Sequence, residues 1–255
     1  MENLYETGVR PLIDEYLQKK SEEVRDYGIY WSASSAGQCK RLIVFKRLGL
    51  PKVPEIVEDS ARSTRVFEAG HIFHEWVQRI TKNAGISISS EQELLEPKYF
   101  IKGHYDDLLD INGRKVLYDY KTANSKAFNY DFGLSDLHRM QLGTYMLMLR
   151  KEHPDLTEAR ILQIEKDTLR MREHDLNYDA NLRDDVVGFW KALNEKWNEY
   201  LEFGTLPDCT CHLIDNGWMA KRTKAGKVYN DFYFNGEPCS MEWYLMNKEN
   251  LNVKQ

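Results

Sequence analysis

Apolar residues recur every three or four positions in five stretches of the chain, the spacing that gathers side chains on one face of a helix. Residues 61–83 are an example, with Val66, Phe73, Val77 and Ile80 on the repeat. The pattern predicts helices over residues 5–27, 35–48, 61–83, 135–151 and 179–203.

Shorter apolar runs between these helices predict strands. One covers residues 86–94, and residues 160–178 form a pair. Residues 99–122 are expected to form a hairpin, because apolar residues flank Asn112-Gly113 on both sides and Asn-Gly favours a two-residue hairpin turn. The order of elements predicts a helical start, an α/β middle and a cysteine-bearing end.

The composition is that of a packed globular protein. The 255 residues are 42% apolar and 29% charged. No apolar run approaches the roughly 18 residues that a membrane span needs. The amphipathic, acidic start of the chain argues against a signal peptide. We therefore expect a cytoplasmic protein without a membrane partner.

The net charge of −5 argues only weakly against nucleic-acid binding. Metal-binding carboxylates lower the net charge without weakening a local basic groove. Two basic clusters occur, and the simplest interpretation of each is a solvated face: Lys40, Arg41, Lys46 and Arg47, and then Lys221, Arg222, Lys224 and Lys227.

The predicted hairpin carries Asp106, Asp119 and Lys121 toward its strand ends, away from the turn. Two carboxylates on adjacent strand ends can hold Mg²⁺ or a similar cation against a phosphate. Lys121 points to the same strand face as Asp119, because side chains alternate along a strand. A cation and a lysine together neutralise charge that develops in phosphoryl transfer. The segment thus supplies the parts needed for phosphodiester hydrolysis. An isolated Asp-x-Lys usually lies on a solvated strand face, but the preceding Gly103-x-x-Asp106 and the hairpin context weaken that interpretation.

Four motifs in order resemble the PD-(D/E)XK nuclease superfamily, most closely its RecB-type exonuclease branch. They are Gly70-x-x-x-His74, Gly103-x-x-Asp106, Asp119-Tyr120-Lys121-Thr122 and Gln141-x-x-x-Tyr145. The resemblance implies a restriction-endonuclease-like core, in which helices flank a central mixed β-sheet. It also implies Mg²⁺- or Mn²⁺-dependent exonuclease activity on DNA. The implied metal ligands are His74, Asp106, Asp119 and the carbonyl of Tyr120. Lys121 would position water and stabilise developing charge, and Gln141 and Tyr145 would guide the DNA strand.

Several of these positions have simpler interpretations. His74 lies on a largely apolar helix, where a lone histidine is usually a core residue, and His71 lies one turn away on nearly the same face. Glu93 is a candidate for an additional group at the metal. Lys166 is a candidate for the phosphate path, although an exposed strand lysine is the simpler interpretation.

Four cysteines divide as one near the start and three near the end: Cys39, then Cys209, Cys211 and Cys239. This division and the stretch Ser34–Arg41 resemble an iron–sulfur subset of the branch. That subset includes the CRISPR-associated adaptation exonuclease and the AddB nuclease domain. The resemblance implies a 4Fe–4S cluster that joins the two ends of the chain as a clasp. The spacing of the later three departs from the family pattern, so a Zn²⁺ site with His212 and four reduced thiols remain alternatives.

We therefore expect a single nuclease domain over residues 1–255. It would comprise a helical start (1–60), an α/β catalytic core (61–204) and a cysteine-bearing region (205–255). No phosphate-binding loop of the G-x-x-x-x-G-K-[ST] type occurs, so a helicase or a repair or adaptation partner would separate strands. The alternative is a nucleic-acid-binding or structural subunit that does not cut.

Overall fold

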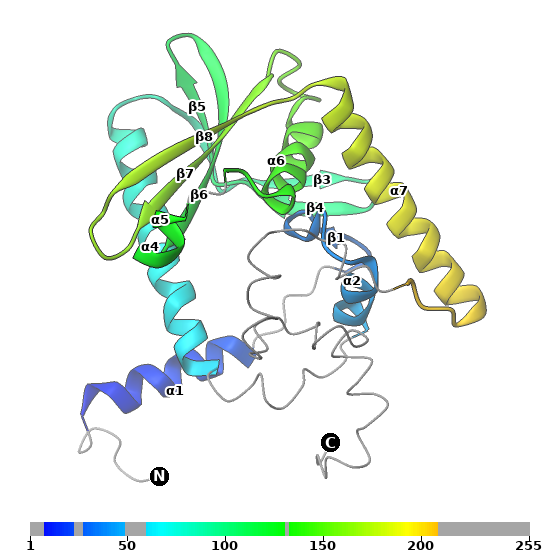
Figure 1. The fold of residues 1–255 in the computed structure, drawn as a ribbon, viewed down its shortest axis with the longest axis horizontal. Helices are drawn as coiled ribbons and strands as arrows, with labels where there is room; N and C mark the ends of the chain where they lie inside the picture. The colour runs from blue at the N-terminus through cyan, green and yellow to red at the C-terminus, as the bar shows by residue number, and fades with distance from the viewer. Residues whose placement is uncertain (1–7, 23–27, 49–59, 131–132, 209–255) are drawn as a thin grey trace.

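The computed structural model describes residues 8–22, 28–48, 60–130 and 133–208. Helices dominate the two ends of this part of the chain and strands its middle (Figure 1). The elements are α1 (Val9–Glu22), β1 (Trp31–Ser32), η2 (Ala33–Ser35), α2 (Lys40–Arg47), α4 (Ser60–Asn83), β2 (Ser87–Ser90), β3 (Glu93–Glu96), β4 (Ile101–His104), β5 (Asp107–Ile111), β6 (Arg114–Ala123), α5 (Ser125–Asn129), α6 (Asp136–Leu149), β7 (Glu158–Glu165), β8 (Met171–Asn177) and α7 (Ala180–Phe203).

The strands form two sheets. The larger has the order β2-β5-β6-β7-β8, and the smaller has the order β1-β4-β3. Within the larger sheet β6 and β7 are parallel, joined by a crossover that contains α5 and α6, and the other neighbours are antiparallel. The expected mixed β-sheet with flanking helices is therefore confirmed.

The two faces of the larger sheet are buried by different helices, as side-chain alternation along β6 requires. Val116, Tyr118 and Tyr120 pack with Val77 of α4 on one face. Leu117 faces the other way, into the larger core that contains Leu142 and other residues of α6. Figure 1 shows α4 and α6 on opposite sides of this sheet. β6 is thus the central strand between two helices.

Most predicted elements are confirmed within a few residues, including the hairpin turn. Asn112 and Gly113 both have positive φ, 55° and 80°, as the turn that joins β5 to β6 requires. Three expectations differ. The first strand of the hairpin predicted over residues 99–122 divides into β4 and β5, which belong to different sheets. The predicted strand 86–94 divides into β2 and β3, which belong to different sheets. The helix expected to run through Cys39 begins at Lys40, with Cys39 as its N-cap residue.

The predictions for the later cysteines and for the second basic cluster concern residues that the structure does not describe. Cys209, Cys211 and Cys239 lie outside the described residues, and so does the second basic cluster. Cys39 is buried, with 1% of its surface exposed. The proposed clasp and the division of the chain into three regions therefore stay predictions. Among the described residues, every helix is too short or too polar to cross a bilayer.

Candidate active site

The β5–β6 hairpin brings Asp106 and Asp119 to neighbouring positions. Asp107, the first residue of β5, pairs with Tyr118, so Asp106 lies at the level of Asp119 where the strand begins. The Asp106 carboxylate accepts a hydrogen bond from the backbone N–H of Tyr120, with Oδ2 2.6 Å from the nitrogen. The first carboxylate is thereby fixed to the strand that carries the second.

Asp119, Lys121 and Gln141 form one polar cluster on the α6 side of the sheet. Lys121 Nζ lies 2.9 Å from Oδ2 of Asp119 and 3.1 Å from Oδ1. Gln141 donates to Oδ1 of Asp119 at 3.3 Å and accepts from Lys121 at 3.4 Å. The amide of Gln141 therefore orients both members of the Asp-x-Lys pair.

Helix α4 brings His74 to the other carboxylate. Nδ1 of His74 lies 3.5 Å from Oδ1 of Asp106, and about a fifth of the His74 side chain is exposed. Burial opposes protonation of His74, but Asp106 and Asp119 raise its pKa above the ordinary value. His71 is more exposed, with its ring centroid 6.3 Å from that of His74. Of the two histidines, His74 is the one beside the carboxylates.

Glu91 completes this group, and the sequence had suggested Glu93 instead. Glu91 lies between β2 and β3 with a φ of 53°, and its N–H points to the carbonyls of Tyr105 and Asp106. The buried side chain of Gln78 donates hydrogen bonds from Nε2 to Oε1 of Glu91, at 2.9 Å, and to the carbonyl of Asp106, at 3.1 Å. Glu93 instead pairs with Lys102 at 2.9 Å on the smaller sheet.

These side chains fit a divalent cation. His74, Glu91 and Asp106 each offer a ligand atom, and these atoms lie within 4.8 Å of one another. Oδ2 of Asp119 is buried and accepts no hydrogen bond from the described residues, despite its contact with Lys121. Carboxylate oxygens suit Mg²⁺ and Mn²⁺, and imidazole is a common ligand. A bound cation would give this oxygen a further partner beside the Lys121 ammonium.

Asp119 and Lys121 both have shifted pKa values, and the shifts indicate different roles for the two side chains. Burial raises the pKa of Asp119 to about 6, although Lys121 opposes the shift. Burial alone would lower the pKa of Lys121, but Asp119 and Asp106 raise it above its ordinary value. Lys121 therefore carries its proton at neutral pH. It can act as a fixed positive charge and hydrogen-bond donor, and it is a poor general base.

A buried carboxylate lies beneath the site. Asp107 accepts hydrogen bonds from Thr81 at 2.7 Å, Ser87 at 2.7 Å and the phenol of Tyr120 at 3.0 Å. These donors belong to α4, β2 and β6. Asp107 therefore ties together α4, which carries His74, β6, which carries Asp119, and β2, which directly precedes Glu91.

Tyr145 lies one turn after Gln141 but points into the core. Only 5% of its surface is exposed, and its ring packs against Gly103. A Cβ atom at Gly103 would lie 2.6 Å from Cβ of Ala33 and 3.0 Å from Cε1 of Tyr145. The glycine of the G-x-x-D motif thus leaves room for Tyr145. The burial favours a packing role for Tyr145 over direct contact with a strand.

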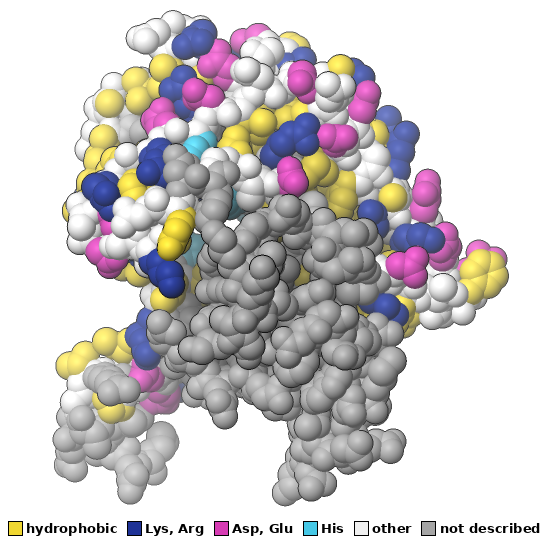
Figure 2. All heavy atoms as spheres, in the orientation of Figure 1, with side chains coloured by type: hydrophobic (Ala, Val, Ile, Leu, Met, Phe, Trp, Pro, Cys, Tyr) yellow, Lys and Arg dark blue, Asp and Glu magenta, His cyan; other side chains and the backbone are white. Residues whose placement is uncertain are grey.

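The first basic cluster is used largely for packing. Lys40 lies over Phe189, Arg41 over Phe45, and Arg47 over both Trp31 and Trp197. The expected solvated face is therefore only partly correct. On the described part of the face shown in Figure 2, Lys and Arg side chains are intermingled with Asp and Glu. Lys166 follows β7, and its N–H donates to the carbonyl of Ala123 at the end of β6.

The described residues thus place two carboxylates, a lysine and a histidine together at one side of a mixed sheet. The family model of the PD-(D/E)XK nuclease superfamily matches residues 85–213, and the chain belongs to that superfamily. A comparison with curated proteins found no match.

Three solved structures are similar in part. The protein SSO0001 is 17% identical, with a TM-score of 0.48, over 84% of this chain and 93% of its own. LHK-Exo in complex with dAMP is 13% identical, with a TM-score of 0.47, over 68% and 90%. A phage-related exonuclease from Haemophilus somnus is 15% identical, with a TM-score of 0.39, over 69% and 96%.

Proposed function

We propose that this protein is a Mg²⁺- or Mn²⁺-dependent deoxyribonuclease that hydrolyses DNA from an end. The observation that carries the proposal is the convergence of His74, Asp106, Asp119 and Lys121 at the end of the β5–β6 hairpin that lies away from its turn. Membership of the nuclease superfamily supports hydrolysis of nucleic acid. Action from an end rests on the resemblance of the motifs to the RecB-type branch.

The metal site would use the side chains of His74, Glu91, Asp106 and Asp119, with the carbonyl of Tyr120 as a further ligand. A bound cation would polarise the scissile phosphate and lower the pKa of a water molecule. The contribution of the protein is to hold the ligand side chains in place. Asp106 is held by the N–H of Tyr120, and Glu91 is held by Gln78.

Lys121 would donate to the phosphate where negative charge develops. Its raised pKa keeps it protonated, and its contacts with Asp119 and Gln141 fix the direction of Nζ. Donors fixed in advance in a site of low dielectric stabilise such charge more effectively than water does. Gln141 would hold this geometry while the strand passes.

The test is digestion of end-labelled linear DNA beside a closed circle, with Mg²⁺ or Mn²⁺, by wild type and Lys121→Ala. We expect wild type to degrade the linear DNA and spare the circle. Loss of one charge-stabilising donor should slow the variant by about 100- to 1,000-fold. Lys115→Ala is a matched control on the same strand, since Lys115 pairs with exposed Asp155 near the turn.

Thermal unfolding must show that Lys121→Ala is folded before its activity is compared. Equal degradation by wild type and Lys121→Ala would remove Lys121 from the mechanism. If wild type leaves every substrate intact with either metal, the protein is a binding or structural subunit.

The four cysteines remain a separate prediction of a 4Fe–4S cluster. Its test is the visible absorbance and the iron and sulfide content of anaerobically purified protein. A brown preparation with about four irons per chain supports the cluster. A colourless preparation with bound zinc, or with four titratable thiols, favours one of the two alternatives.

A further inference from the structure

One flank of α4, beside the candidate metal site, carries two cations, Arg79 and Lys82, that form no ion pair with the described residues. A hollow of about 290 Å³ runs along this flank, lined by Glu75, Gln78, Arg79, Lys82 and Asn83. Gln78 is shared with the metal site, because its amide donates to Glu91 and to the carbonyl of Asp106. The hollow therefore adjoins the metal site through a single buried side chain.

The spacing of residues along α4 also places the hollow next to the candidate metal site. His74, Gln78 and Lys82 are four residues apart, so they form a row along one side of α4, and Arg79 borders it. At a rise of about 1.5 Å per residue, Arg79 and Lys82 lie about 7.5 and 12 Å along the axis from His74. In a B-form duplex each strand advances about 3.4 Å per phosphate along the axis, so for a duplex that runs along α4 these cations lie about two to four nucleotides from the metal site.

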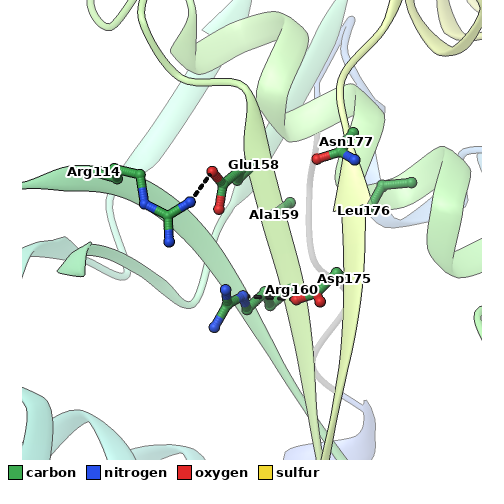
Figure 3. Close-up of a pocket in the computed structure, with 7 residues that line it drawn as sticks. All are labelled: Arg114, Glu158, Ala159, Arg160, Asp175, Leu176 and Asn177. Atoms are coloured by element: carbon green, nitrogen blue, oxygen red, sulfur yellow. Dashed lines mark hydrogen bonds and ion pairs between the residues drawn. The ribbon is translucent and has the colours of Figure 1, made fainter. Parts of the chain in front are cut away.

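Arg79 and Lys82 differ from most other cations of the described part of the chain. Both are exposed, and neither side chain makes a hydrogen bond or ion pair there, although the charge of Lys82 acts at longer range on Asp107. Glu75 lies one turn before Arg79 but forms no ion pair with it. A similar hollow at the start of β7 shows the contrast (Figure 3): its Arg114 pairs with Glu158, and its Arg160 pairs with Asp175. Cations already paired with carboxylates offer little to a phosphate, whereas unpaired ones attract it.

We propose that Arg79 and Lys82 form a phosphate-binding subsite that holds the DNA backbone two to four nucleotides from the cleaved bond. This inference rests on the proposed function and specifies where the substrate runs. Each residue contributes a sequence-independent contact to one phosphate. The subsite sets the direction in which the strand leaves the metal site, along α4 toward Asn83.

The test measures binding of a fluorescein-labelled DNA strand, single and as a duplex, in EDTA at several salt concentrations. Each of Arg79→Gln and Lys82→Gln should reduce the slope of log affinity against log salt. The reduction should be about 0.7 on single strands and about 0.9 on duplex, with the double variant losing the sum. Lys191→Gln is the matched control, because Lys191 is an exposed cation on α7, distant from α4 in Figure 1.

A second measurement localises the contact. Neutral methylphosphonate linkages two to four nucleotides from the cleaved bond should weaken binding of wild type and leave the double variant unchanged. An unaltered salt slope in the double variant overturns the subsite while the proposed function stands, provided that wild type binds DNA and cuts it. Absence of DNA binding in EDTA together with absence of cleavage in Mg²⁺ or Mn²⁺ by wild type overturns both.

Discussion

Tyr120 and Asp107 are joined by a buried hydrogen bond, 3.0 Å from the phenol oxygen to Oδ2, directly beneath the candidate metal site. The backbone N–H of the same Tyr120 donates to Asp106. One residue thus anchors two consecutive aspartates, one through its backbone and one through its ring. The acidic pair at the start of β5 therefore depends on Tyr120 for its orientation.

Tyr120→Phe should reduce the free energy of unfolding by about 1 kcal/mol, the usual net value of one hydrogen bond. It should also weaken metal binding, because Asp107 loses its contact with the strand that carries Asp119. Tyr178→Phe is the control, since the Tyr178 hydroxyl is buried without a hydrogen-bond partner among the described residues. Denaturant unfolding of both variants checks the prediction, and equal destabilisation by the two would contradict it.

Glu91 and Glu93 should differ sharply in their effect on metal affinity. Glu91→Gln removes a candidate ligand that Gln78 holds toward His74 and Asp106, and we expect a loss of about 10- to 100-fold in Mn²⁺ affinity. Glu93→Gln removes ion pairs with Lys102 and His104 on the smaller sheet and should leave the affinity unchanged. Calorimetric titration with Mn²⁺ distinguishes the two. Equal affinities in both variants would exclude Glu91 from the site.

The sequence predicted the centre of the site because local rules determine it. Asn112-Gly113 fixes the hairpin turn, and strand alternation then places Lys121 on the same face as Asp119. Glu91 could not be found in this way. Its position depends on a break between β2 and β3, which join different sheets, and that break is a tertiary feature.

Tyr145 is a second residue whose environment could not be predicted from local sequence rules. Its spacing from Gln141 predicts a shared helix face, and both side chains do project toward the sheets. Their environments differ because Gly103, distant in sequence, leaves a space that the Tyr145 ring fills. Helical periodicity predicts which face of the helix a residue occupies but not how deeply its side chain is buried.

Gly103→Ala should destabilise the protein and disturb the site. The new methyl group would meet Ala33 at 2.6 Å and Tyr145 at 3.0 Å, and neither the backbone-bound Cβ nor the packed ring can move freely. Overpacking of this kind typically costs about 1–3 kcal/mol.

Gly188→Ala, in contrast to Gly103→Ala, should stabilise the protein. A Cβ at Gly188, within α7, meets nothing within 4 Å, so the substitution should stabilise by about 1 kcal/mol through helix propensity. Thermal unfolding of the two variants checks the pair. A Gly103→Ala protein as stable as wild type would mean that β4 and α6 separate without cost.

Glu165 should make the stability of the protein depend on pH in the acid range. Its carboxylate is fully buried at the end of β7 and lies 2.6 Å from Nε of Arg170. Arg170 is the largest of the influences that lower the pKa of Glu165 to about 2 from an ordinary value of 4.5. A carboxylate whose pKa is lower in the folded state stabilises the fold above its unfolded pKa, and this contribution is lost as pH falls toward the folded value.

Glu165→Gln should therefore unfold at a lower temperature than wild type above pH 4.5, with a difference that shrinks between pH 4.5 and pH 2. Glu158→Gln is the control, because Glu158 begins the same strand in a more exposed ion pair with Arg114. Melting curves across this pH range check the prediction. A wild-type-to-Glu165→Gln difference that is constant with pH would show that the Arg170 contact is not what stabilises the turn between β7 and β8.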